Sequence, residues 1–501
     1  MKKTLIFTMA AVVLMSNMGY SFCGFYVAKA DVKLFNKTSQ VIIAKNGDKQ
    51  TVTMSSDFEG DVKDFAMVVP VPVVLEEKDI RTVNQSIFGK LEDYSSPRLV
   101  SYYDETPCYV PRYDYDYGTE ALMSVADAAP MMRMTNVAED TYHVTVEAQY
   151  EIGTYDILIL SAKESGGLEA WLNDNGYKMP VGAKEVLDPY IKTNMKFFVC
   201  KVNLEKFANK GVVDLDPLQI TYTSPKFMLP IRLGMANASG VQDLVIYMYS
   251  KIGRIETTNY RTSLIPTDFK VPLFVQNEFG EFYRDLYDKA WTREGKNTVF
   301  LEYAWEVSPN QTQFCDPCVG DPPMVTDLKE AGVDWLTLAS QDYHTQARTY
   351  AGNVFFTRMH LKYDRAHFPQ DLLFQETANK EKFQGRYIIT HPASGDLSCE
   401  KGQTYIQDLS KRRWNELYTY QWLTGRDITS HYDYPKEYNQ FLTSPGAKKQ
   451  GNIIPVNDFI PEHATKSIGN MLTFFVSVLA FAGVLFALSR KRKAANLEIK
   501  T

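Results

Sequence analysis

Apolar and polar residues alternate between residues 32 and 66, a pattern typical of β-strands that bury one face. Two alternating runs at residues 40–45 and 50–54 flank Asn46-Gly47, the dipeptide most favoured for a type I′ hairpin turn. Residues 65–74 continue as an apolar strand interrupted by prolines, which suit a sheet edge or a domain corner. This stretch therefore predicts a β-rich N-terminal domain.

Strand patterns resume near residue 142, with two short helices inserted among them. The segments 167–176 and 183–192 place apolar residues at helical spacing, and Gly176 suits a helix C-cap. Further strands are predicted at residues 143–150, 155–160, 196–202, 220–223, 227–233 and 243–249.

The last third of the pattern mixes helices with long strands. Residues 273–304 predict a helix followed by a strand, and residues 351–363 predict a long strand. Helices are predicted at residues 327–332 and 405–423, the second ending near Gly425. Runs of strands with inserted short helices indicate an α+β fold with sandwich-like sheets, not a parallel βαβ array.

The N-terminus has the organisation of a secretory signal peptide. Two lysines precede an apolar stretch of about a dozen residues, which is too short to cross a hydrocarbon core of roughly 30 Å. Small residues at Gly19 and Ser21 predict a mature start near Phe22. Residues 28–30 offer a second cleavage site farther from the apolar stretch. A lipid anchor on Cys23 is disfavoured by the bulky residue before it.

The C-terminal region predicts one transmembrane helix. Residues 468–488 contain no charged side chain, and about 20 residues at a rise of 1.5 Å match the bilayer core. The basic cluster at residues 490–493 follows at once, and such clusters stay on the cytoplasmic side of a membrane. The alternative, a buried helix of a soluble domain, does not explain these flanking charges. We therefore expect the bulk of the chain to be extracytoplasmic.

These signals divide the chain into seven parts. They are a signal peptide (1–21), a β-rich N-terminal domain with a tyrosine-rich excursion (22–141), an α+β domain (142–265), a β/helix domain (266–432), a stalk (433–466), a transmembrane helix (467–489) and a cytoplasmic tail (490–501).

Composition adds little to this picture but excludes one class of partner. The net charge is −6, so the surface offers no electrostatic footprint for nucleic acid. Tyrosine (31 residues) outnumbers phenylalanine (28), which suits a β-rich extracytoplasmic protein. We expect the membrane and an envelope protein as partners.

The cysteines provide the first candidate chemistry, because an even number in an oxidising compartment favours disulfides. The sequence cannot choose among their pairings. The structural disulfide candidates are Cys23, Cys108, Cys200, Cys315, Cys318 and Cys399.

Cys315 and Cys318 form the only closely spaced pair, in the motif Cys-Asp-Pro-Cys, and three roles are open to it. A thioredoxin-type dithiol needs its first cysteine at a helix N-terminus, but a glycine and two prolines follow here and cannot continue a helix. A zinc site needs four ligands, and the sequence has no second motif of this kind. A structural disulfide is therefore favoured, with no metal and no cofactor.

Histidines are the next candidates for chemistry. His360 lies in a strand pattern, His367 follows it, and Asp364 and Asp371 lie nearby in the sequence. A proton-transfer or metal-binding role would require these side chains to converge. Their spacing alone does not bring them together, so we favour a partly buried histidine bonded to backbone. The sequence also lacks a G-x-S-x-G elbow and a glycine-rich phosphate loop, so no catalytic residue is assigned.

Residues 101–136 form a tyrosine-rich stretch without a clear period, which indicates a long surface excursion. Tyrosine supplies contact area at low entropic cost, so this stretch is a candidate binding surface. Its candidate binding residues are Tyr109, Tyr113, Tyr115 and Tyr117.

Several segments, in the same order along the chain, resemble a bacterial family catalogued as domain of unknown function 2330. The matching segments are residues 23–25, 64–72, 155–160, 168–177, 225–234, 315–318 and 357–364. The resemblance implies an exported bacterial protein, often with a terminal membrane anchor. It implies no activity, ligand or catalytic residue.

Together these features predict a membrane-anchored extracytoplasmic protein that binds a partner at the cell envelope and is not an enzyme. The competing hypothesis is an extracytoplasmic enzyme, either a thiol–disulfide oxidoreductase using Cys315 and Cys318 or an unrecognised hydrolase.

Overall fold

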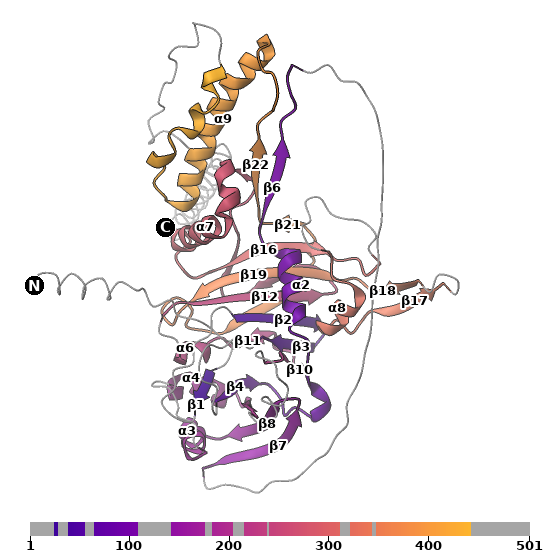
Figure 1. The fold of residues 1–501 in the computed structure, drawn as a ribbon. Helices are drawn as coiled ribbons and strands as arrows, with labels where there is room; N and C mark the ends of the chain where they lie inside the picture. Colours follow the sequence, from indigo (N-terminus) through magenta and orange to yellow (C-terminus); the bar gives the residue numbers. More distant parts are fainter. Residues whose placement is uncertain are drawn as a thin grey trace, which may run out of the picture. The chain divides into compact units, whose positions relative to one another are not determined.

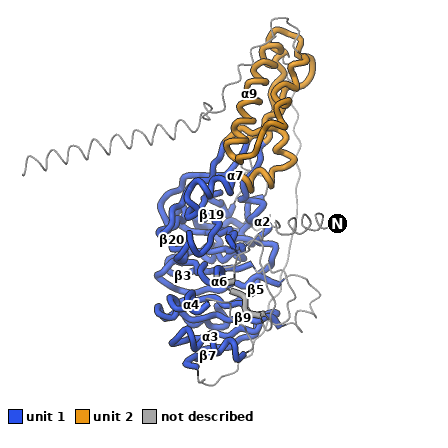
Figure 2. Tube along the Cα trace, turned by 90° about the vertical axis from the view of Figure 1, so that its left-hand side faces the viewer, with its two compact units in different colours: residues 1–100, 115–268, 287–387 blue, residues 101–114, 269–286, 388–501 orange. Residues whose placement is uncertain are grey.

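The computed structural model describes residues 25–28, 39–55, 65–108, 142–175, 183–203, 215–237, 240–310, 321–342 and 347–441. Over these ranges the chain has a strand-rich, mixed α+β fold, as the sequence predicts (Figure 1). The chain divides into two compact units (Figure 2). Unit 1 takes its residues from 1–100, 115–268 and 287–387, and unit 2 from 101–114, 269–286 and 388–501.

The largest sheet belongs to unit 1 and brings together segments that are far apart in sequence. Its order is β14 (Arg261–Leu264), β16 (Thr298–Glu306), β19 (Phe355–Tyr363), β12 (Gln242–Ser250), β2 (Ser39–Asn46), β3 (Lys49–Met54), β10 (Leu218–Thr223) and β5 (Ile80–Thr82), with β21 (Phe383–Gln384) beside β16. Its neighbours are antiparallel except β2 with β12 and β14 with β16. β12 is buried along almost its whole length, as expected for a strand covered on both faces.

The predicted hairpin is confirmed, with a one-residue change in its turn. Asn46 pairs with Lys49, so Gly47 and Asp48 are the central residues of the turn. Gly47 has a φ of +59°, whereas Asp48 is not among the residues with positive φ. A glycine with positive φ at the first central position is the pattern of a type II′ turn and not of the predicted type I′ turn.

The second sheet of unit 1 is antiparallel throughout. Its order is β1 (Phe25–Ala28), β4 (Phe65–Val71), β9 (Lys196–Val202), β8 (Tyr155–Ala162) and β7 (Val144–Ile152). Pro70 lies in β4 beyond the residues that pair with β1, so the sheet has β9 alone as a neighbour at this position. Helices α3 (Ser165–Asp174) and α4 (Ala183–Lys192) form close to the predicted positions and cover the outer face of this sheet (Figure 1).

The two large sheets share one hydrophobic core. Ile157 and Phe198 from the five-stranded sheet lie in the same buried cluster as Val41, Ile246 and Met359 from the nine-stranded sheet. This confirms the sandwich-like packing, since two sheets bury their facing residues against each other. The other face of the larger sheet packs on α2 (Ser86–Ser95) and α8 (Val325–Glu330).

The described residues also form three small sheets and two short helices. They are β11 (Met228–Leu229), β20 (Leu372–Glu376) and β13 (Ile255–Thr257) in one sheet; β15 (Phe269–Lys270), β22 (Arg386–His391) and β6 (Arg98–Tyr103) in another; the pair β17 (Thr337–Gln341) and β18 (Arg348–Ala351); and η1 (Glu77–Asp79) and α6 (Gly234–Asn237).

The strand predicted at residues 227–233 is largely wrong, because only Met228–Leu229 pairs in a sheet. The amides of Ile231 and Arg232 instead donate to the carboxylate of Asp371, at 3.0 and 3.2 Å. Backbone donors used by a side chain cannot continue a strand ladder, so the chain turns here.

Unit 2 is built around the long helix α9 (Glu400–Thr424). Gly425 ends it with a φ of 77°, in agreement with the prediction, and Cys399 caps its start by accepting a hydrogen bond from the amide of Gly402 at 3.3 Å. Helix α7 (Phe279–Arg293) begins in unit 2 and ends in unit 1. The other short helices of unit 2 in the described ranges are η2 (Leu273–Asn277), η3 (Thr429–His431), η4 (Tyr434–Lys436) and η5 (Asn439–Phe441).

Residues 433–441, the first part of the predicted stalk, fold against α9. The guanidinium of Arg413 donates to the carbonyl of Tyr434 at 2.9 Å and lies over the rings of Tyr434 and Tyr438. The hydroxyl of Tyr434 donates to the buried carboxyl of Glu416 at 2.8 Å. This part of the chain is therefore packed and not extended.

The predicted signal peptide, the rest of the stalk, the transmembrane helix at 467–489 and the cytoplasmic tail lie outside the described residues. Within the described ranges, no helix is both long enough and apolar enough to span a membrane. The nine-stranded sheet takes strands from all three predicted extracytoplasmic domains, whose boundaries stay a prediction.

Candidate functional site

The side chain of His360 lies between two carboxylates on the nine-stranded sheet. His360 on β19 has Glu302 on β16 to one side and Asp243 on β12 to the other. Its Nδ1 lies 2.7 Å from a carboxylate oxygen of Glu302, and its Nε2 lies 2.5 Å from one of Asp243. Glu302 is fully buried, whereas Asp243 is partly exposed. The sequence did not predict these partners, since we favoured a bond to backbone.

This arrangement fixes the charge of His360. Burial by itself lowers the pKa of the imidazole, but Asp243 and Glu302 together raise it from 6.5 to about 10. His360 is therefore an imidazolium at neutral pH, with both ring nitrogens occupied as donors. A general base must be neutral and within reach of a substrate proton, so His360 is suited to holding strands together and not to accepting a proton.

Arg358 continues the same cluster toward helix α2. Its Nε donates to Glu302 at 2.6 Å, and its two terminal nitrogens donate to Glu92 at 2.8 and 3.0 Å. Tyr247 also donates to Glu92, and Gln40 donates to Tyr247 at 3.0 Å. Each buried charge thus has an opposite partner, and breaking one such pair costs about 3–5 kcal/mol. The cluster connects strands β2, β12, β16 and β19 to α2.

The other predicted polar residues do not converge on His360. His367 binds Asp364, three residues before it, with 2.8 Å between the ring Nδ1 and the carboxylate. Asp371 lies elsewhere, accepting from Tyr190 at 2.6 Å and from the guanidinium of Arg232 at 2.7 Å. Within the described ranges, no group of three or more His, Cys, Asp or Glu side chains is arranged to hold a metal ion.

Two of the six predicted disulfide cysteines are joined to each other. Cys108 and Cys399, which are 291 positions apart, form a disulfide within unit 2. Cys200 was also predicted to form a disulfide, but it is a free thiol buried in the sandwich core. Burial raises the pKa of this thiol, which keeps it neutral and unreactive. Cys23, Cys315 and Cys318 lie outside the described residues.

The four candidate binding tyrosines, Tyr109, Tyr113, Tyr115 and Tyr117, also lie outside the described residues. The start of the predicted excursion is described and belongs to strand β6. There Tyr102 and Tyr103 are 44% and 75% exposed, and Tyr103 stacks on His391. The binding role of the excursion stays a prediction.

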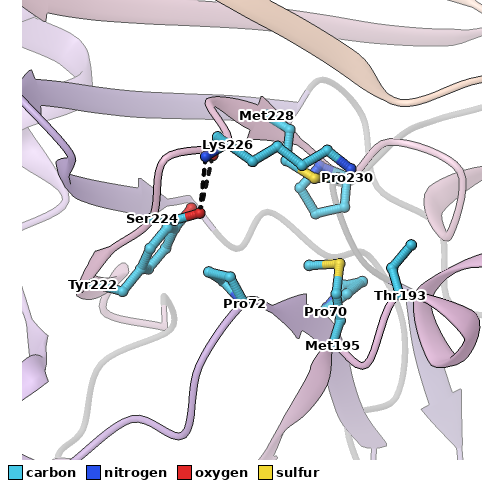
Figure 3. A pocket seen from close by; sticks show the side chains of 9 residues that line it. All are labelled: Pro70, Pro72, Thr193, Met195, Tyr222, Ser224, Lys226, Met228 and Pro230. Carbon is cyan, nitrogen blue, oxygen red and sulfur yellow. Dashed lines mark hydrogen bonds between the residues drawn. The ribbon is translucent and has the colours of Figure 1, made fainter.

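A small pocket lies between the end of β4, the α4–β9 connection and the β10–β11 loop (Figure 3). Its volume is about 120 Å³. Figure 3 shows Lys226, Met228 and Pro230 on one side and Pro70, Pro72 and Met195 opposite them. The lining residues are Pro70, Pro72, Thr193, Met195, Tyr222, Ser224, Lys226, Met228 and Pro230.

The rim of this pocket is held by buried hydrogen bonds. The side-chain amide of Gln50 donates to the carbonyls of Ser224 and Lys226, at 3.0 and 3.1 Å. The amide of Lys226 donates to the hydroxyl of Ser224 at 3.2 Å. Gln50 is fully buried on β3, so the loop has a fixed support beneath it.

Sequence reasoning missed both the charged cluster and the pocket. Glu302 and Asp243 are 58 and 117 positions from His360, so no local spacing marks them. The pocket had a weak signal, since residues 64–72 and 225–234, which supply five of its lining residues, both carry the family resemblance.

Comparison with known proteins identifies one family. A family described as "Uncharacterized protein conserved in bacteria (DUF2330)" matches residues 18–375. No curated protein matches this chain, and no solved structure matches it.

Proposed function

The chain belongs to this uncharacterised bacterial family, and from that premise we propose that it is an exported, membrane-attached envelope protein that binds a partner protein and is not an enzyme. The family description assigns no activity, so the proposal is based on the chain's own residues.

The observation that carries the proposal is the Cys108–Cys399 disulfide. Disulfides form and persist in oxidising compartments and are rare in the bacterial cytosol. The predicted signal peptide at residues 1–21 and the predicted span at residues 467–489 agree with export followed by retention at the membrane. Together they support a location on the outer side of the cytoplasmic membrane.

The polar groups of unit 1 support binding rather than catalysis. His360, which lies between two carboxylates, is charged and has both nitrogens occupied. The pocket of about 120 Å³ is smaller than the roughly 300–1,000 Å³ typical of small-molecule sites. It does have the size of the pockets that accept single side chains at protein interfaces.

The competing enzyme hypothesis depends on Cys315 and Cys318, which lie outside the described residues. None of the described contacts favours it over binding.

The test of export is the state of the cysteines in producing bacteria. Cells are quenched with acid, free thiols are alkylated, and the protein is digested without reduction for mass spectrometry. We expect a peptide pair linked through Cys108 and Cys399 in the full chain, and separately alkylated peptides when residues 2–21 are deleted. Alkylated Cys108 and Cys399 in the full chain would overturn the proposal.

A further inference from the structure

The volume of the pocket in Figure 3 limits what can occupy it. An engineered cavity of about 150 Å³ binds benzene, so a space of about 120 Å³ takes a group slightly smaller than that. A whole cofactor or sugar does not fit. One aliphatic amino-acid side chain does.

The lining selects an apolar group. Three prolines and two methionines contribute rings and thioethers, and Tyr222 contributes part of its ring. Proline rings are rigid, so they hold the shape of the site, while methionine side chains adjust to the branching of an occupant. No lining residue is acidic.

The rim of the pocket carries one exposed positive charge. Lys226 lines the rim and is exposed. Lys226 forms no ion pair with another residue in the described part of the chain. An acidic partner would supply an opposite charge for Lys226, and such complementarity favours both fast association and specificity.

The rim also needs little rearrangement to bind. Gln50 holds the carbonyls of Ser224 and Lys226 from below, so the loop that carries the lysine is already fixed. A preformed site loses little conformational entropy on binding, and anchor pockets of this kind contribute much of the affinity of an interface.

We propose that this pocket anchors one aliphatic side chain of an acidic segment of the partner protein, with carboxylates of that segment against Lys226. The inference rests on the proposed binding function and adds the chemistry of the partner. A segment rather than a lipid is favoured, because the pocket has room for one side chain and none for an acyl chain.

The test uses the full chain in detergent micelles, with ¹³C-methyl-labelled methionine read by NMR. The probes are three blocked peptides: Glu-Glu-Leu-Glu-Glu, the same peptide with alanine in place of leucine, and Lys-Lys-Leu-Lys-Lys. The methyl signals of Met195 and Met228 report on the pocket directly. Burying a leucine side chain is expected to make the acidic leucine peptide bind at least about tenfold more tightly than its alanine version. The lysine peptide should not shift these signals.

Two variants and a matched control locate the effect. Lys226→Glu should weaken the acidic leucine peptide at least about tenfold and allow the lysine peptide to bind, because the rim charge is inverted. Thr193→Trp should abolish the shifts by filling the pocket. Lys184→Glu changes an exposed lysine on α4 that does not line the pocket, and it should leave binding within about twofold.

Equal shifts with the leucine and alanine peptides, or equal binding by the Lys226→Glu variant, would overturn the inference. So would shifts produced by phosphatidylglycerol vesicles and not by the peptides, which would assign the pocket to a lipid. All of these results would leave the cysteine test of export unaffected, so failure of the pocket and failure of the proposed function are distinguishable.

Discussion

Removing the Cys108–Cys399 disulfide should destabilise unit 2 while unit 1 stays folded. The variant to use is Cys108→Ala, because Cys399 also caps α9 and should be kept. A disulfide stabilises a protein mainly by restricting its unfolded state, and the effect grows with the length of the closed loop. The relevant loop depends on which part of the chain unfolds.

If the whole chain unfolds, the loop spans 291 positions, and the loss is about 5–6 kcal/mol. If unit 1 stays folded, its own contacts already close most of that loop. The amide of Arg98 donates to the carbonyl of Gly385 within unit 1, so only the residues from Arg98 to Cys108 and from Gly385 to Cys399 remain free, about 24 in all. A loop of about 24 residues corresponds to about 3 kcal/mol.

Hydrogen exchange measured by mass spectrometry separates these cases. A loss of about 3 kcal/mol should speed exchange of the amides of α9 by about 150-fold, while strands β12 and β19 keep their protection. Thr106→Ala is the matched control, since it removes a 2.8 Å bond from the same segment to the carbonyl of Ser394 and leaves the disulfide intact. Its effect should stay within about 1 kcal/mol. Unchanged exchange in α9, or an equal loss of protection in β12 and β19, would refute the reasoning.

Three further predictions follow from buried charges. The pKa of His360 is raised from 6.5 to about 10. The protonated imidazole therefore stabilises the fold fully below pH 6.5, and this stabilisation is lost as the pH rises through about 10. In denaturant unfolding, the stability of the wild type should fall over this pH range more steeply than that of His360→Gln. Burial raises the pKa of the Glu416 carboxyl from 4.5 to about 7, so its protonation stabilises the fold fully below pH 4.5, and this stabilisation is lost as the pH rises through about 7. The protection of the α9 amides against hydrogen exchange should therefore depend less on pH in Glu416→Gln than in the wild type over this interval. An equal dependence on pH in the two proteins would contradict the assignment. Asp371→Ala should lower the free energy of unfolding, measured with heat or urea, by about 3–5 kcal/mol, because it leaves Arg232 unpaired. The control Arg365→Ala breaks an exposed ion pair with Glu185 and should lower it by about 0–1 kcal/mol.

Local patterns predicted the local structure well. The hairpin around Gly47, helix α4 and the glycine that ends α9 each depend on a few consecutive residues; α4 and the glycine lie where the sequence places them, and the hairpin differs only in its turn. The strand predicted at 227–233 was wrong because its backbone donors are taken by Asp371, a residue about 140 positions away. The signal for that turn was therefore not in the segment itself.

The arrangement of the strands could not be predicted from the same patterns. Strand β2 pairs in parallel with β12, about 200 positions later, and neither strand carries a mark of the other. The partners of His360 come from two further strands for the same reason. Likewise, the pairing of Cys108 with Cys399 depends on where β6 and α9 lie in the fold and not on the spacing of cysteines.

We propose that the folded bulk of this chain lies outside the cytoplasm and is held there by its C-terminal segment. The most direct test adds a protease to the outside of spheroplasts that produce the full chain with a C-terminal epitope. We expect the full-length band to disappear and a membrane-bound fragment that carries the epitope, and begins after residue 441, to remain until the membrane is lysed. A full-length band that survives in intact spheroplasts and is digested only after lysis would contradict the account.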